Sequence, residues 1–358
     1  MKKVLNITIV IAILALMAWG YAGAAHHSAH TSQKGLDPKE IIFSHLGDAY
    51  GWEVPFSHSV RIPLPIIVIG SDGLNVFMSN RVTGGDTYNG YKIATDGDYK
   101  DKVVQVVNGK QVRPWDFSIT KNAAGIMIAA LVVIALAMWI RKWYKKNGMK
   151  APRGGAGLLE LVVEFVYFDT IRPIMGKDAP KYGPYLLTAF FFILTMNLLG
   201  LVVIFPGGAN LTGNLAVTMV LALCTFAITN LTGTKHYWKE ILWPDVPIAL
   251  KCPVPMMPLI EFLGIFTKPL ALMVRLFANM LGGHMVVIVL ILLTFIFTNM
   301  YGVGVGAATS VVSVALALFM LVLDTLISFI QAYVFTLLST IFISMAHVHE
   351  EEPKFEKK

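Results

Sequence analysis

Two long apolar runs near the end of the chain decide the fold: residues 256–297, MMPLIEFLGIFTKPLALMVRLFANMLGGHMVVIVLILLTFIF, and residues 303–347, VGVGAATSVVSVALALFMLVLDTLISFIQAYVFTLLSTIFISMAH. Each is roughly twice as long as the 20 or so apolar residues that a helix needs to cross a bilayer. Both are therefore predicted to be long membrane helices that tilt steeply, break, or project from the bilayer.

The composition agrees with a membrane protein. Of 358 residues, 56% are hydrophobic and only 14% are charged, and the mean hydropathy is +0.65. This balance is too apolar for a soluble domain of this length. The net charge of +7 comes from Lys and Arg residues that gather at the ends of apolar runs. The positive-inside bias explains that arrangement, so no nucleic-acid partner is predicted.

Three shorter apolar runs, at residues 123–140, 185–205 and 215–231, are predicted to be further spans, which makes five in total. The first is followed by a basic cluster that places its end in the cytoplasm: Arg141, Lys142, Lys145, Lys146, Lys150 and Arg153. The connections at 206–213 and 299–306 contain no Lys or Arg and are predicted to lie outside. The C-terminal tail, 348–358, is then cytoplasmic.

Residues 158–175 carry Glu160, Glu164, Asp169 and Arg172 among apolar residues. These are too many charges for a span, and the pattern predicts an amphipathic helix on the cytoplasmic surface. The predicted fold is thus an all-α polytopic membrane protein with five transmembrane helices and this surface helix, with residues 120–347 forming the membrane domain.

The first 25 residues have the pattern of a signal peptide. Lys2 and Lys3 precede an apolar stretch that ends in Ala22-Gly23-Ala24, a small-x-small pattern typical of a cleavage site. The alternative is an uncleaved signal anchor, because the apolar stretch is only slightly short for a span. Both interpretations place residue 26 outside.

Residues 26–119 are more polar and are predicted to form a small external domain that contains β-strands. Strand-like runs at 62–69 and 103–107 alternate with turn signals such as Ser71-Asp72-Gly73. A short helix is expected to begin at Asp37-Pro38. His26, His27 and His30 are interpreted as part of a solvated tail rather than a metal site, because no nearby carboxylate or Cys completes a ligand set.

Ionisable residues at membrane depth are the main functional signal, because each costs several kcal/mol unless it meets water or a partner. Glu261, Lys268 and Arg275 are spaced seven apart, which keeps them on one slowly drifting helix face. Pro269 is expected to bend this helix. The arginine, whose pKa is above about 12, is a fixed positive charge that attracts a carboxylate and repels a second cation.

Further polar residues lie nearer the predicted outer side. Asn279 follows Arg275 by one turn, whereas His284 lies on the opposite side of an ideal helix. In the last span, Asp324 shares one face with Ser328 and Gln331. His284 and Asp324 are expected to form a pair in an external aqueous pocket, where a His and a carboxylate pass protons near neutral pH.

The segment 268–280, KPLALMVRLFANM, strongly resembles the a subunit of F-type ATP synthase, in the helix that holds the stator arginine. The motifs MNLLG at 196–200, GNLAVT at 213–218 and QAYVF at 331–335 agree in order, and the resemblance runs from about residue 152 to residue 347. It does not cover the signal peptide or the external region. Some members of the family have an acid at the position of His284 and a histidine at the position of Asp324. The two residue types are exchanged in this chain.

The resemblance implies a membrane stator with two offset half-channels for H⁺ or Na⁺, in a bacterial inner membrane. Arg275 would separate the half-channels and face the carboxylates of a ring of c subunits. The outer half-channel would be lined by Asn279, His284, Asp324, Gln331 and, less directly, Asn197 and Asn214; the cytoplasmic one by Glu261 and Lys268. The implied partners are the c-ring, b-type peripheral stalk subunits and the rest of the F1Fo complex. No cofactor or metal is implied.

Two other classes of function use the same residues in different ways. An autonomous secondary transporter would use Arg275 to hold a substrate carboxylate, but such folds commonly repeat internally and no second copy of this segment is found. A membrane hydrolase built on His284 and Asp324 lacks a second His or a nucleophile at useful spacing. No phosphate-binding Gly-rich loop occurs either, so ATP chemistry is assigned to other subunits.

Overall fold

The computed structural model describes residues 47–54, 57–82, 86–94, 97, 99–107, 110–148, 150–202, 208–242 and 256–347. The predicted signal peptide, the histidine-containing tail, the short helix at Asp37 and the C-terminal tail lie outside these residues. The chain divides into two compact units, each described by itself below. The first takes in Met1–Ala129, Leu198–Leu211 and Gly283–Asp324, and the second Ala130–Asn197, Thr212–Gly282 and Thr325–Lys358.

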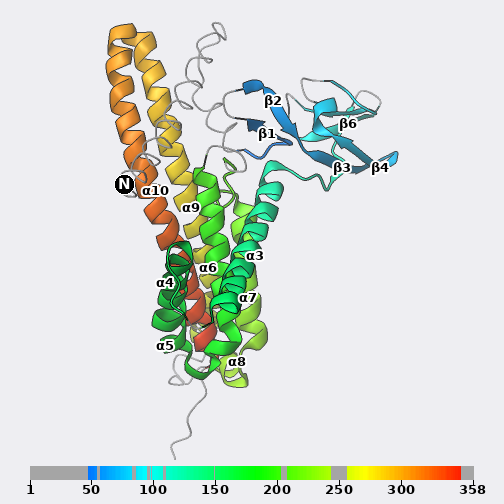
Figure 1. Ribbon diagram of the computed structural model, residues 1–358. Coiled ribbons are helices and arrows are strands. Elements are labelled where there is room, and N and C mark those ends of the chain that lie inside the picture. Colours follow the sequence, from blue (N-terminus) through cyan, green and yellow to red (C-terminus); the bar gives the residue numbers. More distant parts are fainter. Residues whose placement is uncertain are drawn as a thin grey trace, which may run out of the picture. The chain divides into compact units, whose positions relative to one another are not determined.

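The first unit begins with short antiparallel strands, as predicted for the external region (Figure 1). They are β1 (Gly51–Val54), β2 (Ser57–Pro63), β3 (Pro65–Gly70), β4 (Gly73–Met78), β5 (Tyr91–Ile93), β6 (Val103–Val107), β7 (Lys110–Val112) and β8 (Trp115–Asp116). A single turn of 3-10 helix, Ser79–Arg81, follows β4. The strands pair in three small sheets, in the orders β1-β2, β4-β3-β8 and β5-β6-β7.

Side chains from several of these strands pack into one core. Its largest members include Tyr91, Ile66 and Val68, all fully buried, and Phe77 packs against Tyr91 with ring centroids 5.9 Å apart. The predicted strand at 103–107 is confirmed as β6. The turn at Ser71-Asp72 is also confirmed, because Gly70 pairs with Gly73 across it, and Gly73 takes a φ of 90° that a residue without a Cβ tolerates.

The rest of the chain is helical. The helices are α3 (Lys121–Asn147), α4 (Gly155–Val166), α5 (Arg172–Met175), α6 (Ala179–Leu201), α7 (Leu215–Thr232), α8 (Lys235–Leu242), α9 (Met256–Tyr301) and α10 (Val303–Ala346), with a π-helical turn at Tyr167–Ile171 and a 3-10 turn at Gly176–Asp178. Five helical segments of the described chain are long and apolar enough to cross a membrane. This confirms the predicted fold class.

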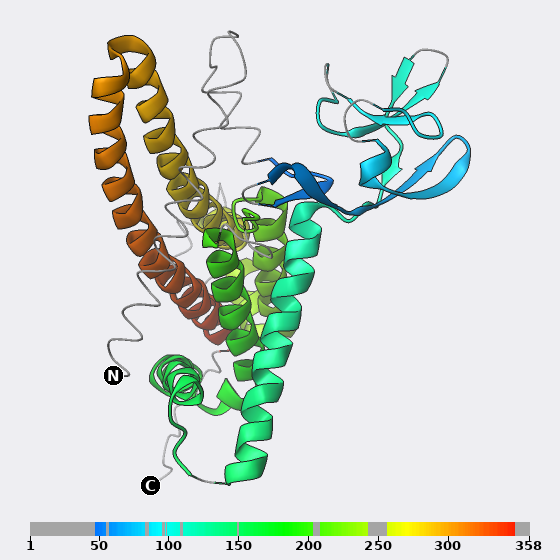
Figure 2. The ribbon, with the colours of Figure 1, turned by 45° about the horizontal axis from the view of Figure 1, so that its top comes forward.

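The two long C-terminal helices are also confirmed, at 46 residues for α9 and 44 for α10. At 1.5 Å per residue they are about 69 and 66 Å long, more than twice a hydrocarbon core of about 30 Å. In the first unit they form an antiparallel hairpin (Figures 1 and 2). Glycines allow the two backbones to approach there, since a methyl group at Gly306 would clash with the Thr298 side chain.

In the second unit, α6, α7 and α10 are held together by buried polar contacts as well as by apolar packing. The Tyr185 hydroxyl lies 3.0 Å from Oγ1 of Thr225, and Thr225 lies 3.2 Å from Oγ of Ser339. On the other side of α10, Phe165 at the end of α4 stacks on Tyr333, with centroids 5.1 Å apart. These contacts fix α6, α7 and α10 relative to one another, and α4 against α10.

Candidate functional site

The part of α9 that lies in the second unit has two chemically different faces. Its inner face is formed by buried apolar side chains: Ile265, Leu272, Leu276 and Met280. Another face carries small residues at three- and four-residue spacing, and Arg275 interrupts them: Gly264, Thr267, Ala271, Arg275, Ala278 and Gly282. We call these six residues the arginine face. Most of it is exposed in this chain, Arg275 included.

The arginine face has two features that suit contact with another helix. Within the part of the chain that the structure describes, no carboxylate pairs with the Arg275 guanidinium. A permanent charge on a membrane-spanning helix needs water or an opposite charge. The small residues on either side let another helix come close to the α9 backbone. The arrangement therefore suits a partner helix that carries a carboxylate.

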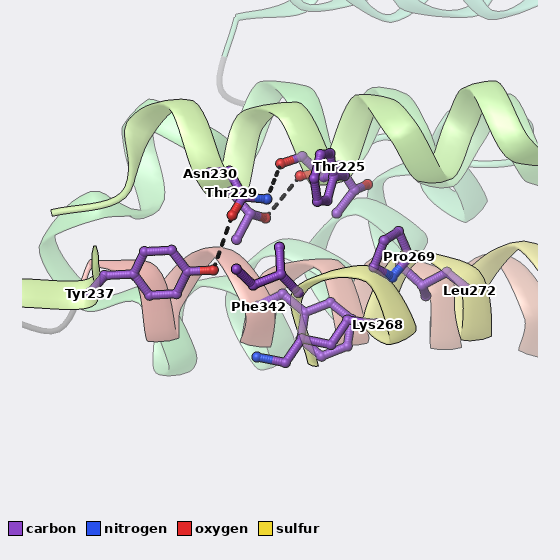
Figure 3. Close-up of a pocket in the computed structure, with 10 residues that line it drawn as sticks. Thr225, Thr229, Asn230, Tyr237, Lys268, Pro269, Leu272 and Phe342 are labelled. Atoms are coloured by element: carbon purple, nitrogen blue, oxygen red, sulfur yellow. Dashed lines mark hydrogen bonds between the residues drawn. The ribbon is translucent and has the colours of Figure 1, made fainter. Parts of the chain in front are cut away.

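A small, partly open pocket lies beside Lys268, one heptad before Arg275 (Figure 3). It is lined by residues of α7, α8, α9 and α10: Thr225, Phe226, Thr229, Asn230, Tyr237, Ile265, Lys268, Pro269, Leu272 and Phe342. The Lys268 ammonium lies 5.7 Å from the centre of the Phe342 ring, a cation–π distance. The α9 helix continues through Pro269 without a break, although proline removes one backbone hydrogen bond.

Hydrogen bonds give this pocket a polar wall. The Tyr237 hydroxyl donates to Oδ1 of Asn230 at 3.2 Å, and Nδ2 of Asn230 donates to the Phe226 carbonyl at 2.8 Å, as Figure 3 shows in part. Burial, together with the negative charge of Glu261, raises the pKa of Tyr237 above its ordinary value of 10. The Tyr237 hydroxyl therefore stays protonated near neutral pH. Lys268 lines the pocket, and Glu261 is close enough to the Tyr237 hydroxyl to affect its pKa.

The structure places His284 and Asp324 in the first unit. The side chain of Asp324 lies against the α9 backbone next to His284: a methyl group at Gly283 would be 2.7 Å from Oδ1 of Asp324. A larger residue at position 283 would require the Asp324 side chain to move. Nε2 of His284 is buried and has no hydrogen-bond partner among the described residues. Asp324 therefore lies beside the residue that precedes His284, but no hydrogen bond joins Nε2 of His284 to Asp324, and their joint role stays a prediction.

Asn279 and Gln331 are half-buried in the second unit. On α10, Gln331 is half-buried and Ser328 is buried in the second unit, and Asp324 is half-buried in the first. The roles of these residues in ion passage stay predictions.

Asn197 and Asn214 make hydrogen bonds that hold the backbone in place. Asn197 is 2% exposed; its Nδ2 donates to the Ser328 carbonyl at 3.3 Å, and its Oδ1 accepts from the Thr212 hydroxyl at 2.7 Å. Asn214 is the N-cap of α7 and accepts a hydrogen bond from the Ala216 amide at 3.0 Å. Both side chains hold elements in place, and whether they also line an ion path stays a prediction.

Sequence reasoning missed several residues of the polar wall. Tyr237 lies on α8, a short helix that was not predicted, and Asn230 lies at the end of an apolar span. A signal was present for the threonines of α7, because Thr218, Thr225 and Thr229 recur at seven- and four-residue spacing and are all buried.

Among the described residues, no three His, Cys, Asp or Glu side chains are grouped as a metal site would require.

The fold and the site define a class: a polytopic helical membrane protein with a fixed positive charge on the exposed face of a membrane helix. The family model of the ATP synthase A chain matches residues 124–344. The chain belongs to this family, which confirms the resemblance found in the sequence. A second model, described as a domain of unknown function, matches residues 41–117.

Relatives of similar length support the assignment. The chain is similar to "ATP synthase subunit a" of Chloroherpeton thalassium, with 39% identity over 67% of this chain and 70% of the relative. It is similar to "ATP synthase subunit a" of Myxococcus xanthus, with 42% identity over 66% and 76%. It is also similar to "ATP synthase subunit a 2" of Chlorobaculum tepidum, with 39% identity over 67% and 66%.

Proposed function

We propose that this chain is the membrane stator of a rotary F-type ATP synthase, in which Arg275 faces the carboxylates of a ring of c subunits. The observation that carries this proposal is the exposed guanidinium at the centre of the small-residue arginine face. Arg275 would attract each arriving carboxylate, displace its ion, and repel a cation that approaches without a ring carboxylate. It would thereby prevent ion leak without rotation.

Two half-channels would lead to this arginine. Asp324, His284, Asn279 and Gln331 would form the outer path, in which a histidine and a carboxylate exchange protons. The cytoplasmic path would use Glu261 and Lys268. The pocket beside Lys268, with its wall of tyrosine, asparagine and threonine groups, supports the second path because an ion needs such groups in place of its hydration shell.

The proposed setting is a bacterial inner membrane. Residues 1–25 would be the signal peptide, 26–119 a periplasmic region, 120–347 the ion-channel domain and 348–358 a cytoplasmic tail. The partners would be the c-ring, b-type peripheral stalk subunits and the remaining F1Fo subunits. In this assignment the chain performs no ATP chemistry itself and couples ion flow, of H⁺ or Na⁺, to rotation.

The test is ATP-driven ion pumping in inverted membrane vesicles that carry Arg275→Ala, with passive ion leak recorded in the same vesicles. We expect pumping to fall to background while the complex assembles normally, because nothing displaces the ion from the ring. Leu270→Ala is a matched control, since Leu270 is exposed on the same helix but lies off the arginine face. Normal pumping by Arg275→Ala would contradict the assignment and favour the transporter interpretation.

A further inference from the structure

The sheet β4-β3-β8 of the external region has one face in the core and one exposed face that is apolar throughout. Ile66, Val68 and Phe77 point into the core. Because side chains alternate along a strand, their neighbours point the other way. The exposed side chains are Ile69, Leu74, Val76, Met78, Trp115 and Phe117. We call these six residues the apolar sheet face.

The register brings these side chains together. Ile69 pairs with both Leu74 of β4 and Trp115 of β8, and the amide of Phe117 donates to the Ile67 carbonyl at 2.9 Å. The exposed fractions are large: 64% for Leu74 and 62% for Val76, with 74% for Trp115 and 61% for Phe117. Soluble surfaces rarely expose so many adjacent large apolar side chains, so such a patch marks an interaction site.

We propose that the apolar sheet face rests on the lipid bilayer at the membrane–water interface, beside the point where α3 enters it. The proposal does not depend on the ion path, because it concerns a region outside the half-channels. It gives a role to the segment that matches a domain of unknown function. The occupant inferred from the residues is the apolar part of the lipid, because none of the six side chains is charged.

Chain continuity with a membrane span argues for lipid rather than another partner. Phe117 is four residues from Lys121, where α3 begins, so the connecting chain is no longer than about 14 Å. Two backbone hydrogen bonds anchor this connecting segment to residues 65 and 49. The amide of Ile119 donates to the Pro65 carbonyl at 3.1 Å, and that of Lys121 to the Ala49 carbonyl at 2.8 Å.

The composition of the face also suits the interface. Tryptophan is enriched where the bilayer meets water, because its ring is apolar and its indole N–H still finds a polar partner. Interfacial elements bury their apolar side by about 5–10 Å into the boundary between headgroups and acyl chains. An apolar face held close to the start of a membrane helix is therefore covered by lipid without any further partner.

The test uses the full chain in its complex, reconstituted in phosphatidylcholine vesicles, with Cys224 and Cys252 changed to Ser. A bimane fluorophore is attached at Val76→Cys, and separately at Gln111→Cys as a control on an exposed residue of the sheet β5-β6-β7. Leu74→Cys is a second position on the face. Brominated phosphatidylcholine probes contact with lipid, and iodide in the buffer probes contact with water.

We expect brominated lipid to quench the fluorophore at position 76 or 74 at least about twofold more than at 111, because insertion brings the face to the acyl chains. High salt should leave this quenching unchanged, since no charge holds the face. Equal, weak quenching by lipid at both sites would overturn the proposal. Iodide then identifies the alternative: strong quenching at 76 indicates an open face, and weak quenching indicates a second copy or another protein.

Discussion

Two polar sites of the second unit, one around Asn197 and one around Arg275, differ in where their partners come from. Asn197 is buried, and both ends of its amide are hydrogen-bonded within the chain. Arg275 is exposed on a helix that spans the membrane. A polar group that is satisfied internally holds helices together, whereas a charge that is left exposed at membrane depth requires water or a partner from outside the chain. Exposure, rather than polarity alone, separates the two roles.

The largest effect expected to distinguish the Arg275 site from the Asn197 site is a steric one on pumping. Ala278→Trp places a bulky ring on the arginine face, and we expect it to reduce ATP-driven pumping at least about tenfold, because a partner helix then cannot approach the α9 backbone. Leu270→Trp is the matched control, since it adds a ring off that face, and it should retain most of the pumping. Equal losses in both variants would mean that the arginine face is no special contact surface.

A smaller effect is expected on stability. Asn197→Leu removes the hydrogen bonds to the Thr212 hydroxyl and the Ser328 carbonyl, and should destabilise the bundle by about 1–2 kcal/mol. Thermal unfolding of the purified complex in detergent measures this, with Arg275→Ala as the comparison. We expect a lower melting temperature for Asn197→Leu and little change for Arg275→Ala. The reverse order would exchange the roles assigned to the two residues.

The smallest effect is expected at the pocket beside Lys268. Tyr237→Phe removes one hydrogen bond to Asn230 and should destabilise the chain by no more than about 1 kcal/mol. Because the pKa of Tyr237 is raised above 10, the stability from its protonated hydroxyl is fully present below pH 10 and is lost as the pH rises further.

The pH profile of pumping provides the check on this residue. Between about pH 6 and pH 9, where the hydroxyl stays protonated, Tyr237→Phe should change the amplitude of pumping slightly and leave the profile in place. A shift of the whole profile would show that the Tyr237 proton takes part in ion transfer, which would make this pocket more than a passive wall.

Much of the fold follows from the sequence, because long apolar runs leave few alternatives to membrane helices. The ends of α9 and α10 and the strand β6 are close to their predicted bounds. The run 62–69 was predicted as one strand, but Leu64 separates β2 from β3 between two prolines, which limit ladder hydrogen bonding. The short helix α8 was missed, since its eight residues are fewer than the window in which helical periodicity is recognised from a sequence.

The site is only partly readable from the sequence. Charged residues in apolar runs identify Glu261, Lys268 and Arg275 without a structure. Which side of α9 is exposed does not follow from its sequence, because an all-apolar helix has little amphipathic pattern. The arginine face became visible only when packing showed that Leu272 and Leu276 point inward. The pairing of Asp324 with Gly283 likewise depends on the register of two helices.

The most direct test is to introduce a photo-crosslinking amino acid at position 278 and, as a control, at position 270, in membranes that contain the whole complex. Mass spectrometry then identifies what each position captures. We expect position 278 to capture a membrane helix of another subunit that carries a carboxylate, and position 270 to give much less of that product. If position 278 captures only lipid or residues of this same chain, the claim that Arg275 faces an external carboxylate is contradicted.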